Sequence, residues 1–164
     1  GADKIQLSGA EHRHGGVRAP TPQKHAFPVA TPSYYWSVVP MPVGMTGYMG
    51  FFSTSATNGL IWMNSTMGEV SRSSGVRTSG GDVITINGRV YVAYTAYSGD
   101  QKGVMRICDI TDGKYNQIFN YTMEASGANG NSTASACLMV RNNELYAVFG
   151  CTGSGLYFYR IACK

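Results

Sequence analysis

An Asn-Gly pair at Asn87 and Gly88 separates two runs in which β-branched and aromatic residues alternate with small or polar ones. Both residues accept the positive φ of a type I′ turn, so the pair is the strongest short-range signal for a β-hairpin. The flanking runs are residues 83–86 and 89–94, and a third run, 103–107, follows a polar loop. The segment therefore predicts a β-meander, and no window after residue 42 shows the 3.6-residue period of an amphipathic helix.

The same arrangement occurs twice more, which predicts a threefold internal repeat. All three copies share the pattern Tyr-x-x-(Phe/Tyr), then a loop, then Gly followed by Leu or Val. Repeats of this kind bury one face each by stacking on their neighbours. The predicted strands of the first copy are residues 43–45, 48–51 and 59–62, and those of the last copy are residues 138–140, 145–149 and 155–159.

The composition supports a β-rich fold. The 164 residues are 43% hydrophobic and 12% aromatic but only 13% charged, with 21 Gly and 11 Tyr, whereas an average soluble domain is roughly 25% charged. The exposed faces of a helical bundle need more Glu, Lys and Arg than this. We predict an all-β fold, an antiparallel β-sandwich built from β-meander repeats. A β-trefoil and propeller-like blades are the alternatives, although three blades fall short of the usual propeller of about four or more.

The prolines and histidines divide the chain into two parts. All six prolines lie between Pro20 and Pro42, and all three histidines lie between His12 and His25. Each proline fixes φ and removes a hydrogen-bond donor, which favours extended chain. We therefore predict an extended arm over residues 1–42 and a β-rich head over residues 43–164.

Several classes of function are disfavoured. A hydrolase triad needs a base, and the chain has no histidine after His25. Asp109 and Asp112 could supply oxygens to a calcium ion, but the further spaced ligands of a loop site are missing, so we expect a plain turn. The basic residues are scattered singly despite a net charge of +4, which disfavours nucleic acid as a partner. No run approaches the roughly 18 apolar residues of a membrane span. We predict that the protein is not an enzyme.

The cysteines leave two interpretations open. Two disulfides, with three possible connectivities, or buried thiols both fit the spacing of Cys108, Cys137, Cys151 and Cys163. Three N-x-(S/T) sequons, at Asn64, Asn120 and Asn131, would permit glycosylation in a suitable host.

Aromatic and small polar residues together are typical of binding loops, because rigid rings provide contact area while small polar groups adapt their hydrogen bonds. A sugar stacks its apolar face on an aromatic ring and meets Asn or Asp with its hydroxyls. An alternative role for the aromatic cluster of residues 34–36 is to pack the arm onto the head. The candidate ligand-binding residues are Asn58, Tyr97, Asp100, Tyr34, Tyr35 and Trp36.

His12 and His14 are the candidate metal ligands. In an extended strand residues i and i+2 point the same way, so both imidazoles could face one direction. Beside a threefold axis, such pairs from three chains would surround one transition metal. The pair is similar to the His-x-His pairs in the trimeric tips of bacteriophage tail fibres. A solvated pair in the arm is the alternative, and we predict no other cofactor.

Residues 55–62 resemble the Asp-box of sialidase-like propellers, S-x-D-x-G-x-T-W. Ser55, Gly59 and Trp62 match, whereas Thr57 replaces the Asp and Ile61 replaces the Thr. Because the Asp-box is structural, the resemblance implies a β-hairpin and not sialidase activity.

The charge-poor composition, the extended arm and the His-x-His pair together resemble the C-terminal receptor-binding head of a viral or bacteriophage fibre. The resemblance lies in composition and organisation, and no family-specific motif carries it. It implies a homotrimer at the virion surface or outside the cell that attaches to a host receptor, either a cell-surface glycan or a protein. The alternative is a secreted lectin or adhesin module, and a glycoside-acting enzyme fragment comes third.

Overall fold

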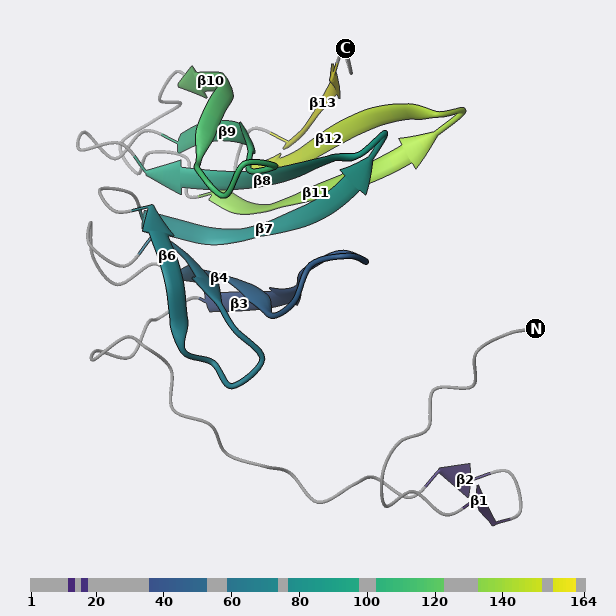
Figure 1. Ribbon diagram of the computed structural model, residues 1–164. Helices are drawn as coiled ribbons and strands as arrows, with labels where there is room; N and C mark the ends of the chain where they lie inside the picture. Colours follow the sequence, from purple (N-terminus) through teal and green to yellow (C-terminus); the bar gives the residue numbers. More distant parts are fainter. Residues whose placement is uncertain are drawn as a thin grey trace.

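The protein is a stack of antiparallel β-sheets, as the computed structural model shows (Figure 1). The structure describes residues 12–13, 16–17, 36–52, 59–73, 77–97, 103–122, 133–151 and 155–161. Within these ranges the chain forms strands and turns and no helix. The predicted all-β fold is confirmed.

Three meanders make up the stack, and in each one consecutive strands pair as neighbours. The first sheet contains β3 (Trp36–Pro40), β4 (Tyr48–Phe52), β5 (Leu60–Met63) and β6 (Glu69–Ser73). The second contains β7 (Arg77–Ile86), β8 (Arg89–Tyr97), β9 (Gly103–Asp109) and β10 (Asn116–Thr122). The third contains β11 (Thr133–Arg141), β12 (Glu144–Cys151) and β13 (Gly155–Ile161). A short separate hairpin pairs β1 (His12–Arg13) with β2 (Gly16–Val17).

The tight turn that precedes β8 has the predicted geometry, and the turn that precedes β12 has the same one. Asn87 and Gly88 have φ values of 50° and 75°, and Asn142 and Asn143 have values of 52° and 57°. Positive φ at both central residues is the signature of a type I′ turn, whose twist matches that of the flanking strands. These turns set the register of β7 with β8 and of β11 with β12.

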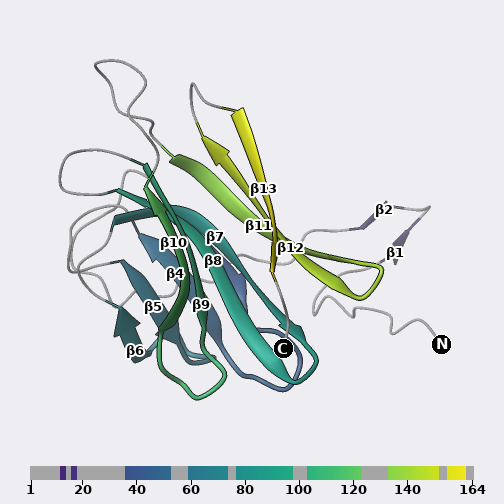
Figure 2. The ribbon, with the colours of Figure 1, turned by 90° about the horizontal axis from the view of Figure 1, so that it is seen from above.

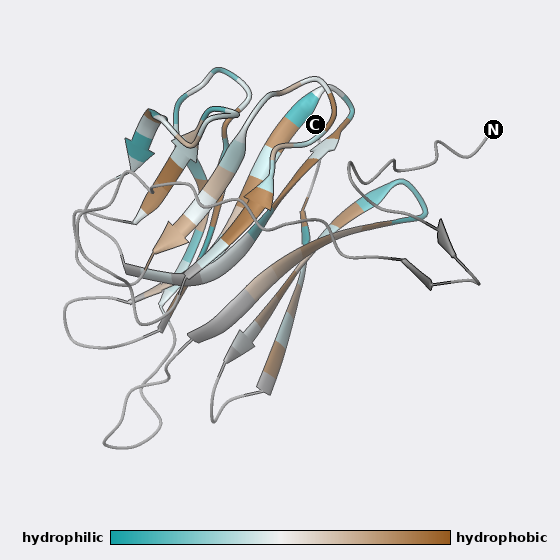
Figure 3. Cartoon of the chain, turned by 90° about the horizontal axis from the view of Figure 1, so that it is seen from below, coloured by the Kyte–Doolittle hydropathy of each residue, from teal (hydrophilic) through white to brown (hydrophobic). Residues whose placement is uncertain are grey.

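The second sheet lies between the other two, with an apolar core on each of its faces (Figure 2). Because side chains alternate along a strand, Val92 and Tyr94 of β8 face the first sheet while Ala93 faces the third. Opposite them, Phe51 of the first sheet and Phe149 of the third are both 0% exposed. Hydrophobic residues accordingly lie along the centres of the strands, and hydrophilic residues lie at several turns (Figure 3). This layered packing agrees with the predicted sandwich.

Two details of the predicted strands are wrong. The first strand of the first copy is β3 (Trp36–Pro40), and residues 43–45 belong to the turn that follows it. Gly44 and Gly47, with φ values of 93° and 91°, form this turn, which the sequence pattern did not separate from a strand. The first two sheets also gain a fourth strand, β6 and β10, that was not predicted. Strand β3 lies within residues 1–42, the segment predicted as an arm, and it pairs with β4.

Candidate functional site

The connections from β4 to β5, from β8 to β9 and from β12 to β13 leave from one end of the stack, which we call the loop end. The arrowheads of β7 and β11 point to the right in Figure 1, so their antiparallel partners β8 and β12 run to the left, as does β4. The loop end is therefore defined by the last residues of β4, β8 and β12 and the first residues of β5, β9 and β13. These residues are Phe52, Tyr97, Cys151, Leu60, Gly103 and Gly155.

The opposite end carries the two type I′ turns together with the longer turns at residues 41–47, 64–68 and 110–115. A two-residue turn leaves little chain to contact a partner, and the turn between β9 and β10 is held by side chains of its own. Residues 53–58 and 98–102, which contain Asn58 and Asp100, and residues 152–154 join the strands of the loop end. Loops held by a rigid sheet are where recognition residues concentrate. The loop end is thus the candidate binding site that the architecture provides.

Three of the predicted ligand-binding residues belong to connections or strand ends at the loop end. Tyr97 is the last residue of β8, and its backbone pairs with Gly103 and with Arg77. The side chain of Tyr97 lies outside the described part of the structure, and so do Asn58 and Asp100 as whole residues. The connections that contain Asn58 and Asp100 start at the ends of β4 and β8, so they leave from the same end of the stack as Tyr97.

Trp36, the last residue of the aromatic cluster, starts a strand at the same end. Trp36 is the first residue of β3, and its backbone pairs with Phe52 at the end of β4. The structure therefore brings Trp36 and Tyr97, which are 61 positions apart (97 minus 36), to strand ends on one side of the molecule. The side chain of Trp36, together with Tyr34 and Tyr35, lies outside the described residues.

The side chains of the predicted metal ligands also lie outside the described part of the structure. His12 belongs to β1, where its backbone pairs with Val17, but its side chain and the whole of His14 are not described. Among the described residues, no group of three or more His, Cys, Asp or Glu side chains converges in a way that could hold a metal ion. The metal site stays a prediction.

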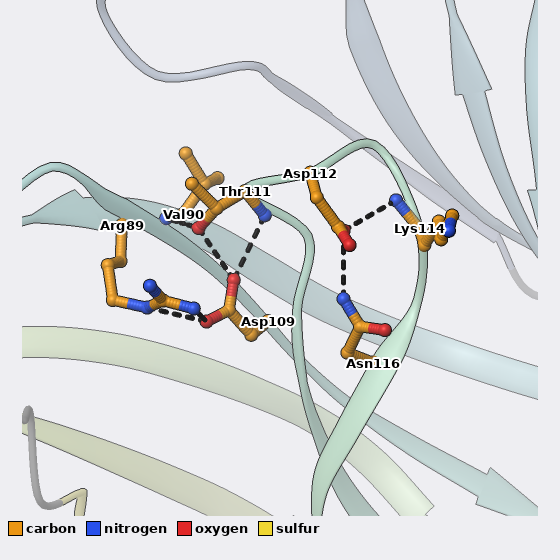
Figure 4. Close-up of polar contacts among 7 residues, drawn as sticks. All are labelled: Arg89, Val90, Asp109, Thr111, Asp112, Lys114 and Asn116. Atoms are coloured by element: carbon orange, nitrogen blue, oxygen red, sulfur yellow. Dashed lines mark hydrogen bonds and ion pairs between the residues drawn. The ribbon is translucent and has the colours of Figure 1, made fainter.

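Asp109 organises the turn between β9 and β10 (Figure 4). One carboxylate oxygen accepts hydrogen bonds from the Thr111 hydroxyl at 2.6 Å and the Thr111 backbone N–H at 3.0 Å, and the other accepts from Arg89 Nε at 2.7 Å. Arg89 also forms an ion pair with this carboxylate through Nη2. Burial alone would raise the pKa of Asp109, but the hydrogen bonds from Thr111 and Arg89 outweigh it, so the pKa lies below its usual value.

Asp112, in the same turn, has a similar structural role. Its Oδ1 accepts hydrogen bonds from the Lys114 backbone N–H at 3.0 Å and from Asn116 Nδ2 at 2.8 Å. The following residue, Gly113, adopts a φ of 80° that favours glycine. The two carboxylates thus bind groups of their own turn.

The five acidic side chains in the described ranges all accept hydrogen bonds from the protein itself. Besides Asp109 and Asp112 of the turn, three of them lie in strands. Among these, Asp82 accepts a hydrogen bond from the backbone N–H of Leu138 in the third sheet. These five residues are Glu69, Asp82, Asp109, Asp112 and Glu144.

The described cysteines are free thiols in different surroundings. Cys108 is buried between the first two sheets, 3.9 Å from the Tyr94 hydroxyl, and Cys137 is exposed on β11. Burial raises the pKa of both thiols. Since Cys108 and Cys137 are free, the alternative of two disulfides that use all four cysteines is not observed. The side chain of Cys151 and the whole of Cys163 lie outside the described residues.

The chain matches no protein-family model, and no curated protein or solved structure resembles it significantly. Over the described ranges, no helix has the length and apolar character that crossing a membrane would require.

Proposed function

We propose that the protein is a non-enzymatic receptor-binding head that attaches a viral or bacteriophage particle to its host. The partner is a cell-surface glycan or protein, bound at the loop end, and the working form is a homotrimer at the virion surface. Nucleic acid is not a partner in this proposal.

The observation that carries the proposal is the convergence of strand ends at the loop end. Trp36 and Tyr97 stand at strand ends there, and the connections containing Asn58 and Asp100 start there. A ligand at this end would meet aromatic, amide and carboxylate groups supplied by separate meanders. This combination suits a polyol, whose ring stacks on an aromatic side chain while its hydroxyls bind the polar groups.

The structural roles of the described carboxylates support the non-enzymatic part. Glycoside hydrolysis needs two carboxylates that flank the scissile bond. Asp109 and Asp112 instead stabilise a turn, and Asp82 bridges two sheets. A glycoside-acting enzyme fragment is for this reason the third candidate, after the receptor-binding head and a secreted lectin or adhesin module.

The test is binding of the full chain to a glycan array and to a panel of bacterial and animal cells. We expect Tyr97→Ala to weaken binding by about tenfold or more, since aromatic hot spots carry much of the energy of an interface. Tyr97→Phe keeps the ring and should retain most of the binding, and Asp100→Ala should also weaken it.

Asp112→Ala is the matched control for Asp100→Ala, because the turn between β9 and β10 lies away from the loop end (Figure 2). Full binding by Tyr97→Ala and Asp100→Ala, with an unchanged circular dichroism spectrum, would move the site elsewhere. Trimeric mass in solution would favour the fibre head over a monomeric lectin, and turnover of a glycoside panel would favour the enzyme fragment.

A further inference from the structure

The second and third sheets are equivalent in register. Counted from the type I′ turns, Ala93 of β8 and Val148 of β12 hold the same place, five residues after Gly88 and Asn143. Their partners on the next strand, Ile107 for Ala93 and Phe158 for Val148, correspond in the same way. Directly opposed residues of paired strands share a face. The face of the third sheet that contains Phe158 is therefore the counterpart of the face of the second sheet that contains Ile107.

In the second sheet this face is covered. Ala93, Met105 and Ile107 are 0%, 0% and 1% exposed, because Leu138 and Phe149 of the third sheet pack against them. An apolar face of one meander thus fits closely onto the apolar face of another.

In the third sheet the corresponding face is exposed. Leu156, the counterpart of Met105, is 67% exposed, Phe158 is 65% exposed and Met139 on β11 is 41% exposed. Between them lie Tyr146 and Val148, which pair with Met139 and Phe158. We call these five residues the open face. Figure 2 shows the third sheet at the outer side of the stack. Contiguous exposed apolar side chains mark interaction surfaces.

The charges beside the open face do not select a strongly acidic or basic partner. Arg160 and Glu144 form an ion pair at 3.3 Å, with side chains 67% and 45% exposed. Glu144 also accepts a hydrogen bond from the Tyr146 hydroxyl at 2.7 Å. Arg141, opposite Glu144 in the register of β11 and β12, adds a second positive charge. Both signs are therefore present in small number, which suits an apolar surface of this same charge-poor chain.

We propose that the open face is covered by an apolar sheet surface of a second copy of this chain. The pattern inside the molecule indicates the kind of occupant, since the equivalent face of the second sheet is covered by a meander of this protein. The proposal rests on the homo-oligomeric state of the proposed function and names the surface that joins the copies.

The test compares the molecular mass of the full chain with that of the variant Phe158→Lys, by light scattering at micromolar concentration. We expect the wild type to have the mass of three chains and the variant that of one, a threefold drop. Val43→Lys is the matched control, because Val43 is 99% exposed, lies outside the open face and should leave the mass unchanged. Circular dichroism checks that each variant is folded.

Alkylation of Cys137 provides a second readout that does not depend on the measured mass. Cys137 pairs with Val148 and so lies on the side of the open face. In the assembled wild type we expect its alkylation, located by peptide mapping, to be at least tenfold slower than in Phe158→Lys.

Each outcome decides between the proposals. A dimer that Phe158→Lys dissociates supports the covered face and tells against the trimer. An oligomer that Phe158→Lys leaves intact overturns the covered face, and a wild-type monomer overturns it as well. A monomer with a protected Cys137 would indicate that another segment of the same chain occupies the face. Loss of the Tyr97 dependence of host binding would count only against the receptor-binding proposal.

Discussion

The backbone N–H of Leu138 donates a hydrogen bond to Asp82 Oδ2 at 2.9 Å, across the interface between the second and third sheets. Leu138 belongs to β11, the edge strand of the third sheet, so this amide points away from the ladder with β12. An unpaired edge amide is a liability in any sheet protein. Asp82 satisfies it and at the same time connects two meanders through residues that are 56 positions apart in the sequence.

We predict that Asp82→Ala destabilises the protein, because the partly buried amide of Leu138 loses its acceptor. The expected loss in the free energy of unfolding is about 1–3 kcal/mol. Urea denaturation followed by circular dichroism measures it. Asp82→Asn retains an acceptor oxygen and should lose less, and equal losses for the two variants would argue that the carboxylate charge matters more than the hydrogen bond.

The stability of the protein should fall in acid partly through Asp109. The pKa of Asp109 in the folded protein lies below its usual value. The ionised carboxylate therefore contributes its full stabilisation above the unfolded pKa of about 4, and this stabilisation is lost as the pH falls through the folded pKa. Asp109→Asn should cost about 1–3 kcal/mol at pH 7.

The measurement is the unfolding free energy of wild type and Asp109→Asn between pH 2 and pH 7. The difference in unfolding free energy between the two proteins should become smaller below about pH 4, because protonation then neutralises the Asp109 carboxylate of the wild type as well. A gap that stays constant down to the lowest pH would contradict this role for the Asp109 charge.

Gly81 permits close packing of the first two sheets. A Cβ placed at Gly81 would lie 2.4 Å from the Ala93 carbonyl oxygen and 2.4 Å from Cε1 of Phe51. We expect Gly81→Ala to cost about 1–3 kcal/mol, as overpacking of a core does. Thermal unfolding is the measurement.

Gly88→Ala is the comparison for Gly81→Ala, because a Cβ at Gly88 meets nothing within 4 Å and the cost there comes from the positive φ of 75°. That cost is about 1–2 kcal/mol. Replacing Phe51 by Leu in the Gly81→Ala background should recover part of the lost stability, whereas the same replacement in the Gly88→Ala background should only lower it.

Cys108 should be unreactive in the folded protein. Burial raises the pKa of its thiol, and the Tyr94 hydroxyl lies 3.9 Å from its sulfur in the same core. We expect alkylation of Cys108 at pH 8 to be at least tenfold slower than in guanidinium chloride, since reaction requires an accessible thiolate. Peptide mapping separates Cys108 from the other cysteines, and rapid labelling in the native state would contradict its place in the core.

The sequence predicted the elements that depend on neighbouring residues. The type I′ turn at Asn87 and Gly88 needs only two residues that tolerate positive φ, and the alternating runs beside it need only to pair with each other. The meanders of the second and third sheets were predictable for this reason. Strand β10, whose residues are mostly exposed, lacks an apolar alternation and was missed. Strand β6 was missed as well, because it is polar and lies at a sheet edge.

Tertiary structure decided which faces are covered and which strand ends meet. Ile107 and Phe158 occupy equivalent places in equivalent strands, yet one is buried and the other is exposed, because the third sheet packs on that face of the second sheet. The sequence identified the residues of the candidate site only by their aromatic or polar character. That Trp36 and Tyr97 share one end follows from the pairing of β3 with β4 and from the stacking of the sheets. Both are long-range contacts that no local pattern of residues encodes.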